Sequence, residues 1–154
     1  KGFAVSLAGR GTPYIYKSYG VPAPQMQIFG GVTQLPWALK PIIGLVSDVL
    51  PIAGYNKAPY VFAASALGAC AYLVVGAVPE SSLPVGSFVV CLFLISLQAS
   101  TCDLLSEAKY AEKMQIHPAH GPAIMTYVWF GMTFGALLAT IASGHCIHNF
   151  GPKS

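Results

Sequence analysis

Charged side chains are scarce in this 154-residue sequence, which has 8 lysines and arginines and 5 aspartates and glutamates. Soluble domains carry about 25% charged residues, because ionised groups keep a folded surface hydrated. Hydrophobic residues make up 55% of the chain. We therefore expect much of the surface to face lipid. The net charge of +3 is too small and too scattered for a nucleic-acid partner, which needs a concentrated basic face.

Motifs of catalysis and of metal binding are also missing from the sequence. No GxGxxG, Walker, GxSxG or HExxH pattern occurs, and the four cysteines form no CxxC pair. Two HxxH pairs, His117 with His120 and His145 with His148, have a spacing that suits two metal ligands on a helix, but no third ligand is apparent. We therefore predict no enzymatic activity, no cofactor and no metal site, and we interpret the histidines as interfacial.

Long uncharged windows dominate the sequence instead. A membrane-spanning helix needs about 20 predominantly apolar residues, and its backbone groups must be satisfied within the segment. The windows predict an all-α membrane protein, a single transmembrane domain over residues 1–154 with about five transmembrane helices. We expect these helices at about residues 2–17, 25–47, 59–78, 86–107 and 122–147, with a connection over 108–121.

Two sequence patterns predict how these helices bend and pack. Pro36 and Pro41 lie five residues apart in the second helix, and because each removes a backbone donor we expect a kink there. In the fifth helix, small residues recur every four positions, which favours close helix packing. These residues are Gly131, Gly135, Ala139 and Ser143.

Polar residues form a stripe on the fourth expected helix. Ser96, Ser100, Asp103 and Glu107 fall at i, i+4, i+7 and i+11, which places them on one face. Ionisable groups within a membrane helix are costly and usually functional, so the stripe predicts a cavity wall. The alternative is that Asp103 and Glu107 lie in the interface, solvated.

Other polar groups occupy the first two helices. Arg10 interrupts the first apolar segment and offers two parallel hydrogen bonds to a carboxylate of the substrate or of the protein. Its alternatives are a structural ion pair with Asp103 or a side chain that reaches the interface. Lys40 and Asp48 bracket the end of the second helix, and Gln34 adds an amide that reads a heterocycle or merely bridges helices.

The second helix carries a signature. The residues Pro36-Trp37, Lys40-Pro41, Gly44 and Ser47-Asp48 form a PWxxKPxxGxxSD pattern, which continues through Pro51, Gly54-Tyr55 and Pro59-Tyr60. This pattern closely resembles the signature of folate-biopterin transporters, and residues 103–114 resemble the acidic region after helix 4 of protozoan members. Where relatives often have consecutive arginines, this chain has Asn56-Lys57-Ala58, which weakens the expected charge network of the loop.

The resemblance implies a fold and an activity. The family belongs to the major facilitator superfamily and has about twelve helices, so we expect this chain to be an N-terminal-half fragment whose missing C-terminal half completes the cavity. It implies alternating access in a lipid bilayer, in the plasma membrane, with uptake of folate, biopterin or a related pteridine coupled to protons. The expected substrate-binding or coupling residues are Arg10, Gln34, Lys40, Ser100, Asp103 and Glu107, and the expected gate residues are Asp48 and Lys57.

The sequence leaves three alternatives open. In the first, the transporter carries another metabolite, such as S-adenosylmethionine. In the second, the chain is a non-transporting subunit built on the same helical bundle. A haem-binding redox subunit is the third, and it requires histidine pairs deep within facing helices, which His145 and His148 near the end of the chain do not provide.

Overall fold

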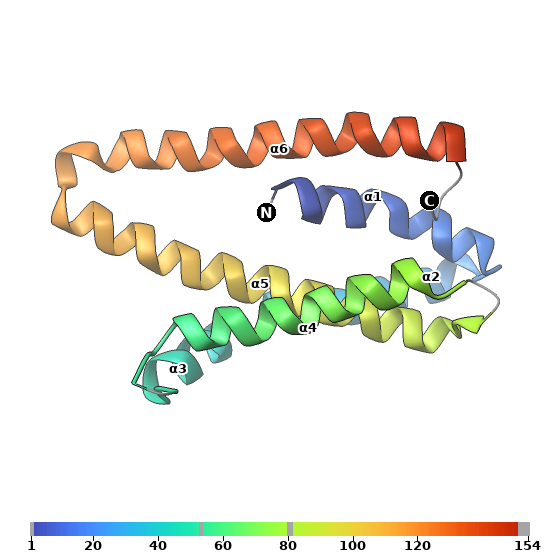
Figure 1. Ribbon diagram of the computed structural model, residues 1–154, viewed down its shortest axis with the longest axis horizontal. Coiled ribbons are helices and arrows are strands. Elements are labelled where there is room, and N and C mark those ends of the chain that lie inside the picture. Colours follow the sequence, from blue (N-terminus) through green and yellow to red (C-terminus); the bar gives the residue numbers. More distant parts are fainter. Residues whose placement is uncertain (1, 53, 80–81, 151–154) are drawn as a thin grey trace. The chain divides into compact units, whose positions relative to one another are not determined.

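The computed structural model describes residues 2–52, 54–79 and 82–150, leaving aside the side chains of residues 2–4, 7, 8, 10 and 146–150. The described residues are helical almost throughout, with an isolated β-bridge between Ile52 and Tyr55. The elements in chain order are α1 (Gly2–Ser18), α2 (Ala23–Ala38), α3 (Lys40–Val49), α4 (Ala58–Ala77), α5 (Val85–Ile116), the 3₁₀ turn η2 (Pro118–His120) and α6 (Gly121–Phe150) (Figure 1). The all-α prediction is confirmed.

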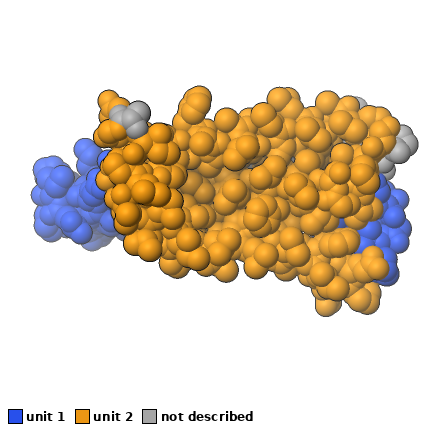
Figure 2. All heavy atoms as spheres, turned by 90° about the horizontal axis from the view of Figure 1, so that it is seen from below, with its two compact units in different colours: residues 1–22, 108–154 blue, residues 23–107 orange. Residues whose placement is uncertain are grey.

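The chain divides into two compact units, which Figure 2 distinguishes by colour. Residues 23–107 form one unit, which contains α2, α3, α4 and most of α5. Residues 1–22 and 108–154 form the other, which contains α1, the end of α5, η2 and α6. The signature in α2 and α3 and the polar stripe of α5 therefore belong to the same unit.

The expected second helix is broken in the structure. Leu39, with φ −83° and ψ 0°, separates α2 from α3. Pro36 lies inside α2, and Pro41 lies in the first turn of α3, where its missing N–H leaves no helical hydrogen bond unmade. The kink predicted from the two prolines is thus a break, with Trp37 on one side of it and Lys40 on the other.

The helix α5 is longer than the sequence suggested. It continues to Ile116 instead of ending near residue 107, so most of the expected connection over 108–121 is helical. Residues 108–116 are rich in Ala, Lys, Glu and Met, which favour helices. The Nζ atom of Lys109 lies 3.3 Å from Oε2 of Glu112, one turn later in the helix. The charged residues after Glu107 therefore form a polar extension of α5, and the helix does not end where they begin.

Among the residues that the structure describes, three helical segments are long and apolar enough to cross a membrane, namely Ala58–Ala77, Val85–Ile116 and Pro118–His145. The remaining helices α1, α2 and α3 have 17, 16 and 10 residues. Half of the apolar window in α5 is buried against protein, compared with 11% in α4 and 6% in α6. The lengths and the exposed apolar faces of the three segments are those of an integral membrane protein, and α5 has the largest buried share of the three.

In the unit of residues 23–107, α4 packs closely on α5. A Cβ atom added at Gly68 of α4 would lie only 2.7 Å from the Cβ atom of Gln98 in α5. One turn away, the Ser65 hydroxyl lies 3.6 Å from the Cys102 thiol. The absence of a side chain at Gly68 is therefore what lets the two helices approach.

In the unit of residues 1–22 and 108–154, α1 packs against α6 (Figure 1). Two members of the small-residue stripe of α6, Ala139 and Ser143, are buried, whereas Gly135 is half-buried and Gly131 is exposed. The C-terminal part of the stripe thus faces protein, as expected for close packing of helices through small residues.

Candidate functional site

Lys40, the first residue of α3, contacts two carboxylates of α5. Its Nζ atom pairs with Oδ2 of Asp103 and lies 3.9 Å from Oε2 of Glu107. The two acidic residues are four positions apart, so they share one face of α5. The side chain of Asp103 is 6% exposed, that of Lys40 21% and that of Glu107 46%. The Lys40 ammonium therefore lies beside one buried carboxylate, that of Asp103, and one half-exposed carboxylate, that of Glu107.

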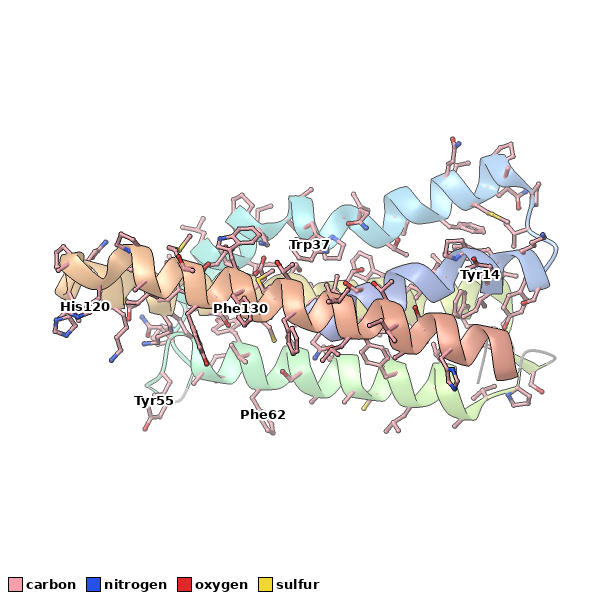
Figure 3. All side chains as sticks on the ribbon, turned by 90° about the horizontal axis from the view of Figure 1, so that it is seen from above. Tyr14, Trp37, Tyr55, Phe62, His120 and Phe130 are labelled. Carbon is pink, nitrogen blue, oxygen red and sulfur yellow. The ribbon has the colours of Figure 1, made fainter. Side chains whose placement is uncertain are left out.

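An aromatic ring completes this group of residues. Trp37 lies in the last turn of α2, near the junction with α3 (Figure 3), and its ring is half-buried. Nζ of Lys40 lies over the Trp37 ring, 4.6 Å from its centroid. This is a cation–π contact, in which the negative face of the indole attracts the ammonium. We call Trp37, Lys40, Asp103 and Glu107 the charged cluster.

Small and hydroxyl side chains place α3 against α5. A Cβ atom at Gly44 of α3 would meet Leu104 of α5 at 3.4 Å, so the two helices touch beside the ion pair. Ser47, one turn after Gly44, is fully buried and donates to the carbonyl of Gly44 at 2.8 Å. Ser100 of α5 is also fully buried and donates to the carbonyl of Leu97 at 3.1 Å. Both hydroxyls thus form a hydrogen bond within their own helix, which offsets the free-energy cost of burying a polar group.

Burial makes the ion pair sensitive to the loss of either member. Removing a charge from water costs several kcal/mol, and the attraction of a close partner offsets this cost. Asp103 is the most buried member, and Lys40 is its partner from the other side of the helix break. Any ligand or proton that changes the charge of Asp103 therefore changes how strongly α3 is held to α5.

The structure brings some of the predicted site residues together and leaves others apart. Lys40, Asp103 and Glu107 meet, and Ser100 lies buried one turn before Asp103. Gln34 is exposed on α2 and, within the described part of the chain, makes none of the cluster's contacts. The side chain of Arg10 lies outside the described residues.

Sequence reasoning missed two features of this site. It expected both Lys40 and Asp103 at the site but did not pair them, whereas the structure joins them in an ion pair. The alternative of an ion pair between Arg10 and Asp103 stays a prediction, because the side chain of Arg10 lies outside the described residues. It also treated Trp37 only as part of the signature, although Trp37 precedes Lys40 by three residues, a spacing at which helical side chains meet. That spacing was the available signal for the cation–π contact.

The expected gate residues lie at the two ends of the connection between α3 and α4. Asp48 is exposed near the end of α3, and Lys57 is half-buried directly before α4. Gly54 turns the chain between them with a φ of +81°, which a side chain would strain. The hydroxyl of Tyr60 in α4 donates to the carbonyl of Leu50 at 2.7 Å, so the connection is tied back to the end of α3.

The described residues contain no group of three or more His, Cys, Asp and Glu side chains that suits a metal ion. The rings of His117 and His120 lie edge to face, 6.3 Å between centroids, and both residues are exposed. His145 is exposed on α6, and the side chain of His148 lies outside the described residues.

Comparison with known proteins finds relatives along the chain. The model of the BT1 family matches residues 1–154. "Probable folate-biopterin transporter 6" of Arabidopsis thaliana is 30% identical over 99% of this chain and 30% of its own length. "Folate-biopterin transporter" of Synechocystis sp. is 24% identical over 92% of this chain and 28% of its own length. "Putative folate transporter 2" of Plasmodium berghei is 32% identical over 70% of this chain and 23% of its own length.

The chain thus spans less than a third of the length of these relatives. No solved structure matches it.

Proposed function

The chain belongs to the BT1 family, and on that premise we propose that it forms part of a transporter that carries folate, biopterin or a related pteridine across a membrane. Relatives that match nearly the whole chain are named as transporters of these compounds. Their names describe transport and not catalysis, so we propose no enzymatic role. We further propose that the chain lies in the N-terminal half of a major-facilitator-type bundle, in the plasma membrane.

The charged cluster is the observation that carries this proposal. Charged groups among apolar helices are costly, so they mark the path of a polar substrate or an ion. A pterin ring presents neighbouring N–H donors, which match the two oxygens of a carboxylate such as Glu107. Folate adds carboxylates of its own, which an ammonium such as Lys40 attracts. The cluster therefore offers complementary groups for both substrate classes.

The break between α2 and α3 supports alternating access. In such transporters the two halves of the bundle move around a central site, and interrupted helices supply flexible backbone there. Lys40 lies directly after the break and is bound to α5 through Asp103. We propose that this ion pair stabilises one conformation and that the rest of the protein provides the opposite wall of the cavity.

The same ion pair supports a proposal of proton coupling. A protonated Asp103 no longer attracts the Lys40 ammonium, so the contact between α3 and α5 weakens. A ligand shifts a conformational equilibrium by its differential affinity for the two states, and a proton on Asp103 does the same. We propose Asp103 as the coupling carboxylate, with Lys40 and Glu107 as the charged groups that respond.

The connection between α3 and α4 is proposed as part of the gate. Asp48 and Lys57 carry opposite charges at its two ends, and the Tyr60 hydrogen bond limits how far it moves from α3. In this proposal Asp48 and Lys57 stabilise one conformer through charge interactions. Charge reversal at both positions together should then restore uptake that reversal at either position alone reduces.

Uptake by the full-length protein in vesicles tests the proposal. We expect saturable uptake of labelled biopterin or folate that an inward proton gradient stimulates. Asp103→Asn should retain binding but lose the stimulation by the gradient. Uptake of neither compound above the level of protein-free vesicles contradicts the substrate proposal, and uptake of S-adenosylmethionine alone reassigns the substrate. Full pH-dependent uptake by Asp103→Asn contradicts the coupling role.

A further inference from the structure

Trp37 provides a flat aromatic surface inside the charged cluster. Its ring is half-buried at the end of α2, and the ammonium of Lys40 lies over it, 4.6 Å from the centroid. The same ammonium pairs with Asp103 and lies 3.9 Å from Glu107. Lys40 thus makes a cation–π contact with Trp37 and, independently of the ring, ion pairs with the two carboxylates.

An ammonium and a planar heterocycle compete for the same face of an indole. Both are attracted to it, the ammonium by the charge of the π-face and the heterocycle by stacking. If Lys40 leaves the Trp37 ring, its ion pair with Asp103 is still available, so the displaced charge stays compensated. The cost of uncovering the ring is therefore limited to the cation–π contact.

We propose that Trp37 is the stacking platform for the planar ring of the substrate, and that Lys40 covers this platform until the substrate arrives. This inference rests on the proposed function. The bound ring lies on Trp37, its N–H edge faces Glu107, the more open of the two carboxylates, and Lys40 is held by Asp103. Trp37 is thereby a specificity-determining residue for flat heterocyclic substrates.

Uptake kinetics of Trp37 variants in the full-length protein test this inference. Removing an aromatic partner from a stacked base weakens binding roughly 5- to 150-fold. Trp37→Leu should raise the KM for biopterin by a factor in this range while the maximal rate changes about twofold or less, because stacking contributes to binding in general. Trp37→Phe keeps a ring and should stay within about threefold of the wild-type KM.

Two comparisons separate stacking from a merely structural role. Tetrahydrobiopterin has a reduced pyrazine ring in which two carbon atoms are tetrahedral, so the ring is puckered. Trp37→Leu should therefore raise its KM less than that of planar biopterin. Trp129, the second tryptophan of the chain, is exposed on α6, and Trp129→Leu should leave both KM values unchanged. Equal KM changes for the two substrates, or a Trp37→Leu KM within twofold of wild type, overturns the inference.

Fluorescence gives an independent measurement if Trp37→Leu fails to reach the membrane. Pterin added to the full-length protein should quench its tryptophan emission in a saturable way, and Trp37→Phe, which keeps the aromatic platform, should lose that component. Identical quenching in wild type and Trp37→Phe overturns the inference. If the wild-type protein transports no pteridine, the proposed function is wrong. If the wild type transports biopterin and Trp37→Leu has the same KM, only the proposed role of Trp37 is wrong.

Discussion

Lys40 and Asp103, which are 63 residues apart in the chain, form an ion pair that holds α3 to α5 beside the helix break. The pair connects the two sequence features that contain the expected site residues, namely the signature of α2 and α3 and the polar stripe of α5. Because Asp103 is buried and Lys40 is partly buried, solvent screens this pair less than it screens an exposed pair.

Loss of the ammonium should destabilise the protein strongly. Lys40→Met removes the positive charge beside a buried carboxylate, and breaking such a pair costs about 3 kcal/mol. We expect this loss in the free energy of unfolding of the full-length protein in mixed micelles. The matched control is Lys109→Met, because Lys109 and Glu112 form an exposed pair at 3.3 Å that contributes about 0.3 kcal/mol. Equal losses in the two variants would show that burial does not strengthen the Lys40 pair.

The two carboxylates should couple unequally to Lys40. A double-mutant cycle with Lys40→Met and Asp103→Asn should give a coupling energy of about 2 kcal/mol, and the cycle with Glu107→Gln about 0.5 kcal/mol. The difference follows from geometry, because Glu107 lies 3.9 Å from Nζ and is half-exposed, whereas Asp103 is in direct contact and buried. Unfolding measurements on the four proteins of each cycle supply both values, and a larger coupling for Glu107 would reverse this assignment.

The helices of this chain were predictable because hydrophobicity is a local property. Apolar windows located α1, α4 and α6, and Pro36 and Pro41 located the break in the second helix. The end of α5 was placed too early, because charges after Glu107 were interpreted as a membrane boundary. The helix propensity of residues 108–116 favours the continuation, so a local signal for the longer helix is present in the sequence.

The partners within the site were less predictable. The spacing of Ser100, Asp103 and Glu107 placed them on one face of a helix, and the structure buries Ser100 and Asp103 there. The ion pair of Lys40 with Asp103 was not predicted, because it depends on how two helices that are distant in sequence align. That alignment is set by close contacts such as Gly44 with Leu104, which no local pattern specifies.

A methyl group at Gly68 should force α4 away from α5. The new Cβ atom would lie 2.1 Å from Oε1 of Gln98 and 2.7 Å from its Cβ atom. The amide can rotate away, but the Cβ atom is fixed to the helix, so the backbones must separate. Overpacking of this kind costs about 1–3 kcal/mol, and we expect Gly68→Ala to lose that much stability in the same unfolding measurement.

Gly76 supplies the control for this substitution. It lies in the same helix, and a Cβ atom there would meet nothing within 4 Å. Gly76→Ala should therefore leave stability unchanged or raise it by up to about 1 kcal/mol through helix propensity. A loss at Gly76 as large as the loss at Gly68 would assign the effect to glycine itself and not to the contact with Gln98.

The Tyr60 hydroxyl should stabilise the end of α3 locally. It donates to the carbonyl of Leu50 at 2.7 Å, and a hydrogen bond of this kind contributes about 0.5–1.5 kcal/mol. Tyr60→Phe keeps the ring and removes the donor, so hydrogen exchange at the amides of Val49 and Leu50 should accelerate roughly 2- to 10-fold, with little change at α5. Tyr55→Phe is the control, because Tyr55 lies in the same connection and is exposed. If both variants exchange alike, the hydroxyl of Tyr60 does not restrain the connection, and its proposed part in limiting the gate is wrong.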